Sequence, residues 1–147
     1  MKKSVVIIIA LIYVAAVALV SFFGLAHKTF DEIIYVSDIK LTSEGIKPAP
    51  ADVPILENGE KEYDYYVVIR PDEHGLRKFQ VEYRVEPDNA TNKDIIITAN
   101  ADDLADNGIT IDEFNVITFS KRGSITVQII PEDHSLPNPI KLKIYAY

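Results

Sequence analysis

A run of 23 residues without any charged side chain, Ser4 to Ala26, constrains this chain more than any other feature. At a rise of ~1.5 Å per residue, a helix of this length is about 34 Å long and can cross a hydrocarbon core of ~30 Å. The apolar region of a cleaved signal peptide is shorter, at ~7–15 residues. The length therefore predicts an uncleaved signal anchor, although Gly24 and Ala26 leave cleavage after Ala26 as the alternative.

The charges that flank this run predict how the chain is oriented. Lys2 and Lys3 precede it, whereas Asp31 and Glu32 follow soon after it. The positive-inside tendency places the lysines in the cytoplasm and the remaining chain outside the cell. We therefore expect a single-pass protein of the cell membrane. Its parts are a cytoplasmic end at 1–3, a transmembrane helix at 4–26, a juxtamembrane segment at 27–32 and an extracellular domain at 33–147.

The composition of the outer part excludes several functions. Two of the 15 Lys and Arg precede the apolar run, so 13 stand against all 22 Asp and Glu, a net charge of −9. Such a surface is unsuited to nucleic acid or to lying flat on an anionic membrane. The chain has no cysteine, which excludes disulfides and thiol chemistry. An outer domain must therefore be stabilised by its hydrophobic core.

Alternating apolar and polar residues predict that the outer part is built from strands. The clearest case is 78–86, in which Phe79, Val81, Tyr83 and Val85 share one face. Similar alternation occurs at 63–70, 125–129 and 140–146, and shorter candidates lie at 36–41, 95–99, 109–111 and 116–119. The eight prolines lie outside the interiors of these segments, and none of the segments has a sustained helical period. This pattern is typical of an all-β sandwich or barrel of about seven to eight strands.

The segment VEYRVEPDNATNKDIIITAN, Val81 to Asn100, resembles the middle of bacterial Ig-like domains of group 2. In that family a strand ends in proline and is followed by a Pro-x-Asn-Ala-Thr loop. Further likeness lies at Val36–Leu41, Ile109–Asp112, Val116–Phe119 and Gly123–Val127, so that it covers most of 36–147. The resemblance implies an Ig-like antiparallel β-sandwich in which 87–93 is a structural loop. It leaves the place of the additional strand Tyr63–Arg70 open.

Motifs for catalysis, cofactors or metals are not found in the sequence. It contains no Gly-x-Ser-x-Gly, no phosphate-binding loop and no His-Glu-x-x-His. His27, His74 and His134 are far apart, which favours solvated side chains over metal ligands. Asp102 to Asp106 is acidic but does not fit the ligand spacing of an EF-hand, so a solvated loop is favoured over weak calcium binding. We expect no catalytic residue, no cofactor and no metal.

These features predict a non-enzymatic, membrane-anchored protein whose outer Ig-like domain acts as a cell-surface interaction or adhesion module. The family resemblance suggests this role, because such domains are common in adhesins and envelope proteins. A protein or a cell-envelope polymer is the expected partner. The alternative is an accessory or assembly subunit of a membrane or envelope complex, held through its transmembrane helix. An enzyme is the third possibility.

The last predicted strand supplies the candidate surface for a partner. Ile140, Leu142, Ile144 and Ala146 are expected to face the core. The candidate partner-facing residues on the opposite side are Lys141, Lys143, Tyr145 and Tyr147. Exposed tyrosines on a rigid strand suit binding because they supply contact area at low entropic cost. The alternative is that tyrosine is a good strand former and that lysine protects a sheet edge from aggregation.

Overall fold

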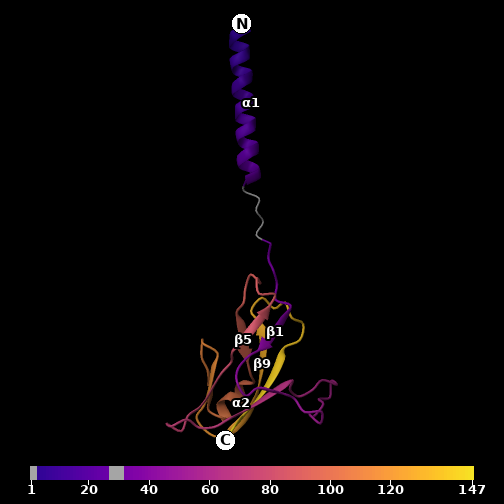
Figure 1. Ribbon diagram of the computed structural model, residues 1–147, viewed down its shortest axis with the longest axis vertical. Helices are drawn as coiled ribbons and strands as arrows, with labels where there is room; N and C mark the ends of the chain where they lie inside the picture. Colours follow the sequence, from indigo (N-terminus) through magenta and orange to yellow (C-terminus); the bar gives the residue numbers. More distant parts are fainter. Residues whose placement is uncertain (1–2, 27–31) are drawn as a thin grey trace. The chain divides into compact units, whose positions relative to one another are not determined.

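The computed structural model describes residues 3–26 and 32–147 and separates the chain into two units, Met1–Glu32 and Ile33–Tyr147 (Figure 1). The first unit contains helix α1 (Lys3–Ala26). From Ser4 to Phe23 its side chains are exposed all round, and it is long and apolar enough to span a membrane. The predicted N-terminal helix is thus confirmed, and it starts one residue earlier than expected.

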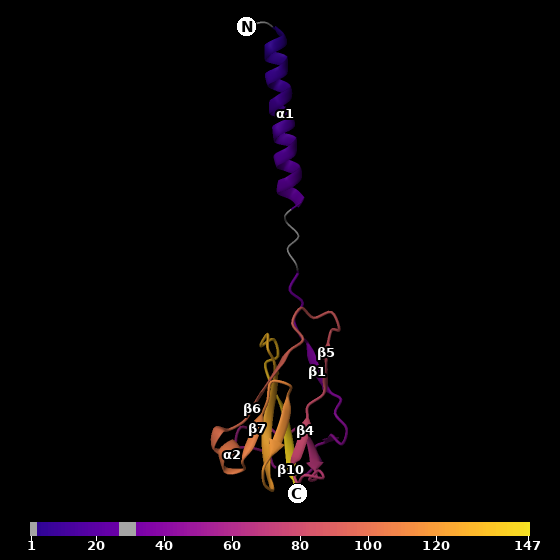
Figure 2. The same cartoon turned by 90° about the vertical axis from the view of Figure 1, so that its left-hand side faces the viewer.

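The second unit is built mainly of short strands. Its elements in chain order are β1 (Asp38–Leu41), β2 (Lys47–Pro48), β3 (Tyr65–Ile69), β4 (Arg77–Gln80), β5 (Tyr83–Glu86), β6 (Ile95–Thr98), α2 (Ala101–Asp106), β7 (Ile109–Ile111), β8 (Val116–Phe119), β9 (Gly123–Pro131) and β10 (Ile140–Ala146). A five-stranded sheet has the order β2-β3-β10-β9-β6. A three-stranded sheet has the order β4-β8-β7, and β1 pairs with β5 (Figures 1 and 2). The predicted β-rich fold with an N-terminal helix is therefore confirmed.

Residues 77–86 form one extended run that changes its partner half-way. β4 pairs with β8, and just beyond it the Val81 N–H donates to the Asn115 carbonyl at 3.0 Å. At the next residue the run turns to the other side, where the Thr42 N–H donates to the Glu82 carbonyl at 2.9 Å and β5 pairs with β1. The two smaller sheets are therefore joined through this run into one layer.

Strands β3 and β10 depart from the expected antiparallel arrangement, because they run parallel. Their register pairs Leu142 with Tyr65 and Ala146 with Ile69. All other strand pairs in the described chain are antiparallel. Neighbouring parallel strands need a long connection between them. Here the connection from β3 to β10 comprises most of the domain. The additional strand predicted at 63–70 is β3, and its place is beside the C-terminal strand.

One hydrophobic core lies between the layers. It draws side chains from both, and its most deeply buried members are Ile117, Phe119, Val127, Ile129, Leu142 and Ile144. The predicted inward faces of 78–86, 125–129 and 140–146 agree with this, because Val81, Val85, Ile125 and Ala146 are also buried. Tyr83 and Ile140 are half-buried and pack against the core.

The face predicted for 63–70 is only partly correct. Val67 and Ile69 are buried in the core, but Tyr65 is 37% exposed. Tyr63 is buried outside that core, with its ring edge-on to the ring of Tyr66 at 6.5 Å. Tyr63 precedes the strand, and the alternation of buried residues within the strand holds at Val67 and Ile69 but not at its first residue, Tyr65.

Helix α2 corrects the expectation of a solvated loop at Asp102–Asp106. The Asn100 side chain caps it by accepting a hydrogen bond from the Asp102 N–H at 2.9 Å. Asp102 and Asp103 lie in its first turn, where carboxylates interact favourably with the helix dipole. Leu104 packs against the core, and α2 lies beside β7 (Figure 2). Six residues are too few to produce a helical period in the sequence.

Val127→Asp is expected to unfold the second unit. Val127 is fully buried in β9, and an unpaired carboxylate there should reduce the free energy of unfolding by roughly 3 kcal/mol or more. Gln128→Asp is the matched control, because the next side chain along β9 is exposed. Urea denaturation followed by circular dichroism compares the two variants. Equal stability of both would show that β9 does not face a core in this register.

Candidate functional site

Strand β10, which carries the candidate partner-facing residues, lies inside the five-stranded sheet. It pairs with β3 on one side and β9 on the other. Leu142, Ile144 and Ala146 face the core, so Lys141, Lys143 and Tyr145 share the outer face. The alternative explanation for the lysines, protection of a sheet edge, is therefore wrong. An interior strand has no free edge to protect.

A segment of the same chain lies over this outer face. Residues 49–64, here called the cover segment, connect β2 to β3. The Lys141 ammonium contacts the Glu60 carboxylate at 2.6 Å, and the Lys143 ammonium contacts Glu62 at 2.7 Å. The two lysine side chains are only 15% and 18% exposed as a result. The hydrogen bond from Lys141 lowers the pKa of Glu60, which remains exposed so that solvent screens the pair.

Main-chain bonds hold the cover segment at the same place. The Asp64 N–H donates to the Lys141 carbonyl at 2.8 Å, and the Lys141 N–H donates to the Asp64 carboxylate at 2.9 Å. The Ala49 N–H donates to the Asp64 carbonyl, which closes the segment on itself. Val53 is buried within it although it lies outside the main core.

The tyrosines of the predicted stripe differ in their surroundings. Tyr145 is half-buried and lies near Tyr63 of the cover segment. The interaction with the Tyr145 side chain, together with burial, raises the pKa of Tyr63 to about 12. Tyr147 is 62% exposed. The structure therefore brings Lys141, Lys143 and Tyr145 together under the cover segment and leaves Tyr147 open to solvent.

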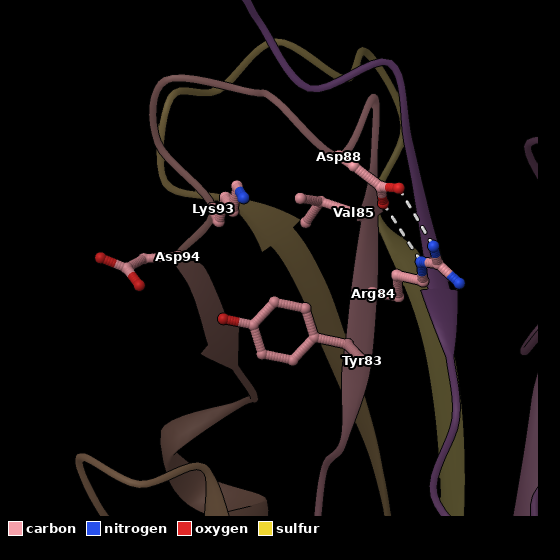
Figure 3. A pocket seen from close by; sticks show the side chains of 6 residues that line it. All are labelled: Tyr83, Arg84, Val85, Asp88, Lys93 and Asp94. Atoms are coloured by element: carbon pink, nitrogen blue, oxygen red, sulfur yellow. Dashed lines mark hydrogen bonds and ion pairs between the residues drawn. The ribbon is translucent and has the colours of Figure 1, made fainter.

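A second feature is a hollow of about 410 Å³ between β5 and the start of β6 (Figure 3). Its lining residues are Tyr83, Arg84, Val85, Asp88, Lys93 and Asp94. The Tyr83 ring reaches across toward β6, and burial raises the pKa of Tyr83. Lys93 and Asp94 lie on the far side from β5.

The loop at 87–93 forms one end of this hollow and is held by several hydrogen bonds. Ala90 is buried, and its N–H donates to the Pro87 carbonyl at 3.0 Å. Thr91 exchanges hydrogen bonds with Ile34 through both its N–H and its hydroxyl. Asp88 accepts two hydrogen bonds from the Arg84 guanidinium at 3.0 and 3.2 Å, and these lower its pKa.

The candidate metal ligands are not brought together. Among the residues that the structure describes, no group of three or more His, Asp or Glu side chains could hold a metal ion. His74 and His134 lie in separate turns, at 72–76 and 131–135, and His27 lies outside the described residues. Asp102 and Asp103 lie in the first turn of α2, and Asp106 ends it.

No protein-family model matches this chain, and no curated protein matches it.

Sequence reasoning missed the pairing between the stripe and the cover segment. One signal was available, because Glu60 and Glu62 have the same spacing of two residues as Lys141 and Lys143. Charges at this spacing lie on one face of an extended chain. Their separation of about 80 residues hid the match.

Removing the Tyr63 hydroxyl should change how stability depends on alkaline pH. A pKa of about 12 in the folded state exceeds the value of ~10 for a free tyrosine. Its contribution is therefore fully present below pH ~10 and is lost as the pH rises toward 12. Tyr63→Phe should lose less stability than the parent chain between pH 9 and 11.5, measured by urea denaturation. Tyr65→Phe, at the exposed neighbour, is the control, and an identical loss in all three would contradict the assignment.

The two tyrosines of β10 should differ when they are shortened. Tyr145→Ala removes a half-buried ring that lies near Tyr63, so the free energy of unfolding should fall by roughly 1–3 kcal/mol. Tyr147→Ala should change it by no more than ~0.5 kcal/mol, because that side chain is mainly exposed. Thermal melting of the two single variants makes the comparison. Equal losses would show that Tyr147 also packs against the domain.

Proposed function

We propose that this chain is a non-enzymatic, membrane-anchored protein whose extracellular Ig-like β-sandwich acts as a cell-surface interaction module. The order of its strands is the observation that carries the proposal. An Ig-like sandwich places strands A, B, E and D in one sheet and C, F and G in the other. Here β1, β4 with β5, β8 and β7 follow the first order, and β6, β9 and β10 follow the second.

Strand β3 also fits this scheme. It lies beside β10 and runs parallel to it, as the second half of a first strand that has crossed to the opposite sheet would do. Residues 42–64 would then be an insertion within that first strand. The proline-rich connector at 43–54 lies in this insertion and supports the crossing.

Helix α1 supports the anchor. Its length and apolar surface suit a single membrane span, and Lys2 and Lys3 favour a cytoplasmic N-terminus. The second unit would then lie outside the cell. Its excess of carboxylates would keep it from lying flat on anionic lipid.

One observation favours the second candidate, an accessory or assembly subunit held through its helix. The cover segment occupies the outer face of β10, which leaves less of that face free for a partner. An exchange of residues 3–23 for an unrelated membrane helix separates the two candidates. Cross-linking to partners in cells should persist after the exchange if the outer domain is the interaction module, and should be lost if the helix makes the contact.

Protease added to intact cells or protoplasts should remove the second unit and leave the helix in the membrane. The expected result follows from an uncleaved anchor with its C-terminal side outside. Immunoblotting with tags at both ends, before and after permeabilisation, measures it. Protection of the domain in intact cells, or a mature N-terminus at His27, would contradict the proposed anchor and orientation.

A further inference from the structure

The extended run 77–86 directs its main-chain groups alternately to its two sides. Odd-numbered residues face β8, as the bond from the Val81 N–H to Asn115 shows. Even-numbered residues face β1, as the bond from Thr42 to the Glu82 carbonyl shows. This alternation is a general property of a paired strand. It determines where the main chain of each β5 residue points.

Strand β8 is too short to pair with the whole run. It starts at Val116, and its partner at that level is Gln80. Asn115 adopts a left-handed conformation, with φ 60°, and ends the ladder just past Val81. The N–H and C=O groups of Tyr83 and Val85 therefore point to the side that β8 has left. In the described part of the chain, no main-chain or side-chain partner bonds to them.

The hollow of Figure 3 lies along this free edge of β5. Tyr83 and Val85 give it an apolar wall, because both side chains pack against the core. Charges of both signs surround it, with Arg84 and Asp88 on one side and Lys93 and Asp94 on the other. The turn that ends the β8 ladder carries Phe114, which is 68% exposed.

We propose that this free edge binds an extended peptide segment of a partner protein, which adds as a short strand beside Tyr83–Val85. The bound segment would continue the line of β8 and satisfy the free main-chain groups of β5, as in other cases of strand addition. Its alternate side chains would lie against the half-buried Tyr83 ring, so small apolar residues fit there. The proposal rests on the interaction role proposed above and assigns a surface to it.

The length of the edge indicates a peptide rather than a second folded copy. Tyr83 and Val85 span about 7 Å at ~3.4 Å per residue, enough for a strand of roughly three or four residues. The loop at 87–93 bounds one end, and the turn at 112–115 bounds the other. A flexible peptide can enter between the loop and the turn, whereas a rigid edge strand of another folded domain would clash with both.

The test uses the full chain in lipid nanodiscs and a displayed library of random short peptides as the probe. The best binder is then synthesised in two N-methylated forms. One carries methyl groups on alternate amides, and the other carries them on the amides between. Because the amides of a strand alternate in direction, only one form loses its hydrogen bonds to β5. That form should bind at least about tenfold more weakly than the other.

Amide hydrogen exchange locates the peptide on the same sample. Bound peptide should slow exchange at Tyr83 and Val85 by about tenfold or more. Arg84 serves as the internal control, because its N–H faces β1 in either state. The proposal is overturned if no peptide binds, if both methylated forms bind alike, or if the slowed amides lie elsewhere. Dimers of the full chain that exclude the peptide would assign the edge to a second copy and would also overturn it.

Failure of this test is distinguishable from failure of the proposed function. Peptide binding in nanodiscs does not depend on which side of the cell membrane the domain faces. The protease experiment and the helix exchange test the anchored interaction role without reference to the β5 edge.

Discussion

The position of β10 between β3 and β9 is the constraint on which the rest of the domain depends. Its inner side chains Leu142 and Ile144 are fully buried and meet the opposite layer through the shared core. Its outer side chains hold the cover segment through Lys141, Lys143 and Tyr145. Its main chain places β3 in the sheet, because among the strands of residues 32–147 the other neighbour of β3 is the two-residue β2. One strand therefore contacts the core, the neighbouring strand β3 and the cover segment.

The other layer is organised by the change of partner at Val81 and Glu82. Because of this change, one extended run pairs with β8 through its first half and with β1 through its second half. The two small sheets are thereby joined into one layer that covers the core. Within residues 32–147, the same change leaves Tyr83 and Val85 without a neighbouring strand on the side that faces away from β1. The two candidate binding surfaces therefore differ in accessibility. The outer face of β10 is covered by the cover segment, whereas the edge of β5 that faces away from β1 is accessible.

Much of the fold could be predicted from local pattern, because alternation and turn residues act within a few positions. The apolar run gave α1 to within one residue, and the strands at 95–98, 109–111 and 116–119 follow the expected segments. Alternation identifies the buried face of Val67 and Ile69 but not the strand beside them, so the parallel pairing with β10 was missed. Helix α2 was missed because its six residues follow from a cap at Asn100 and not from a period. The cover segment and the free β5 edge depend on contacts between distant residues and on where β8 ends, and no local pattern encodes either.

The placement of β3 beside β10, with Tyr66 opposite Lys143, sets the order of strands in the larger sheet, and a cysteine cross-link can test it. The chain contains no cysteine, so Tyr66→Cys combined with Lys143→Cys creates one pair at directly opposed positions on the outer face. Tyr66→Cys combined with Thr126→Cys is the control, because Thr126 lies one strand further away, opposite Lys143 on β9. Mild oxidation followed by mass spectrometry should show a disulfide in the first variant and none in the second, since a bridge needs Cα atoms within ~7 Å. A disulfide in the control and not in the first variant would contradict this order of strands.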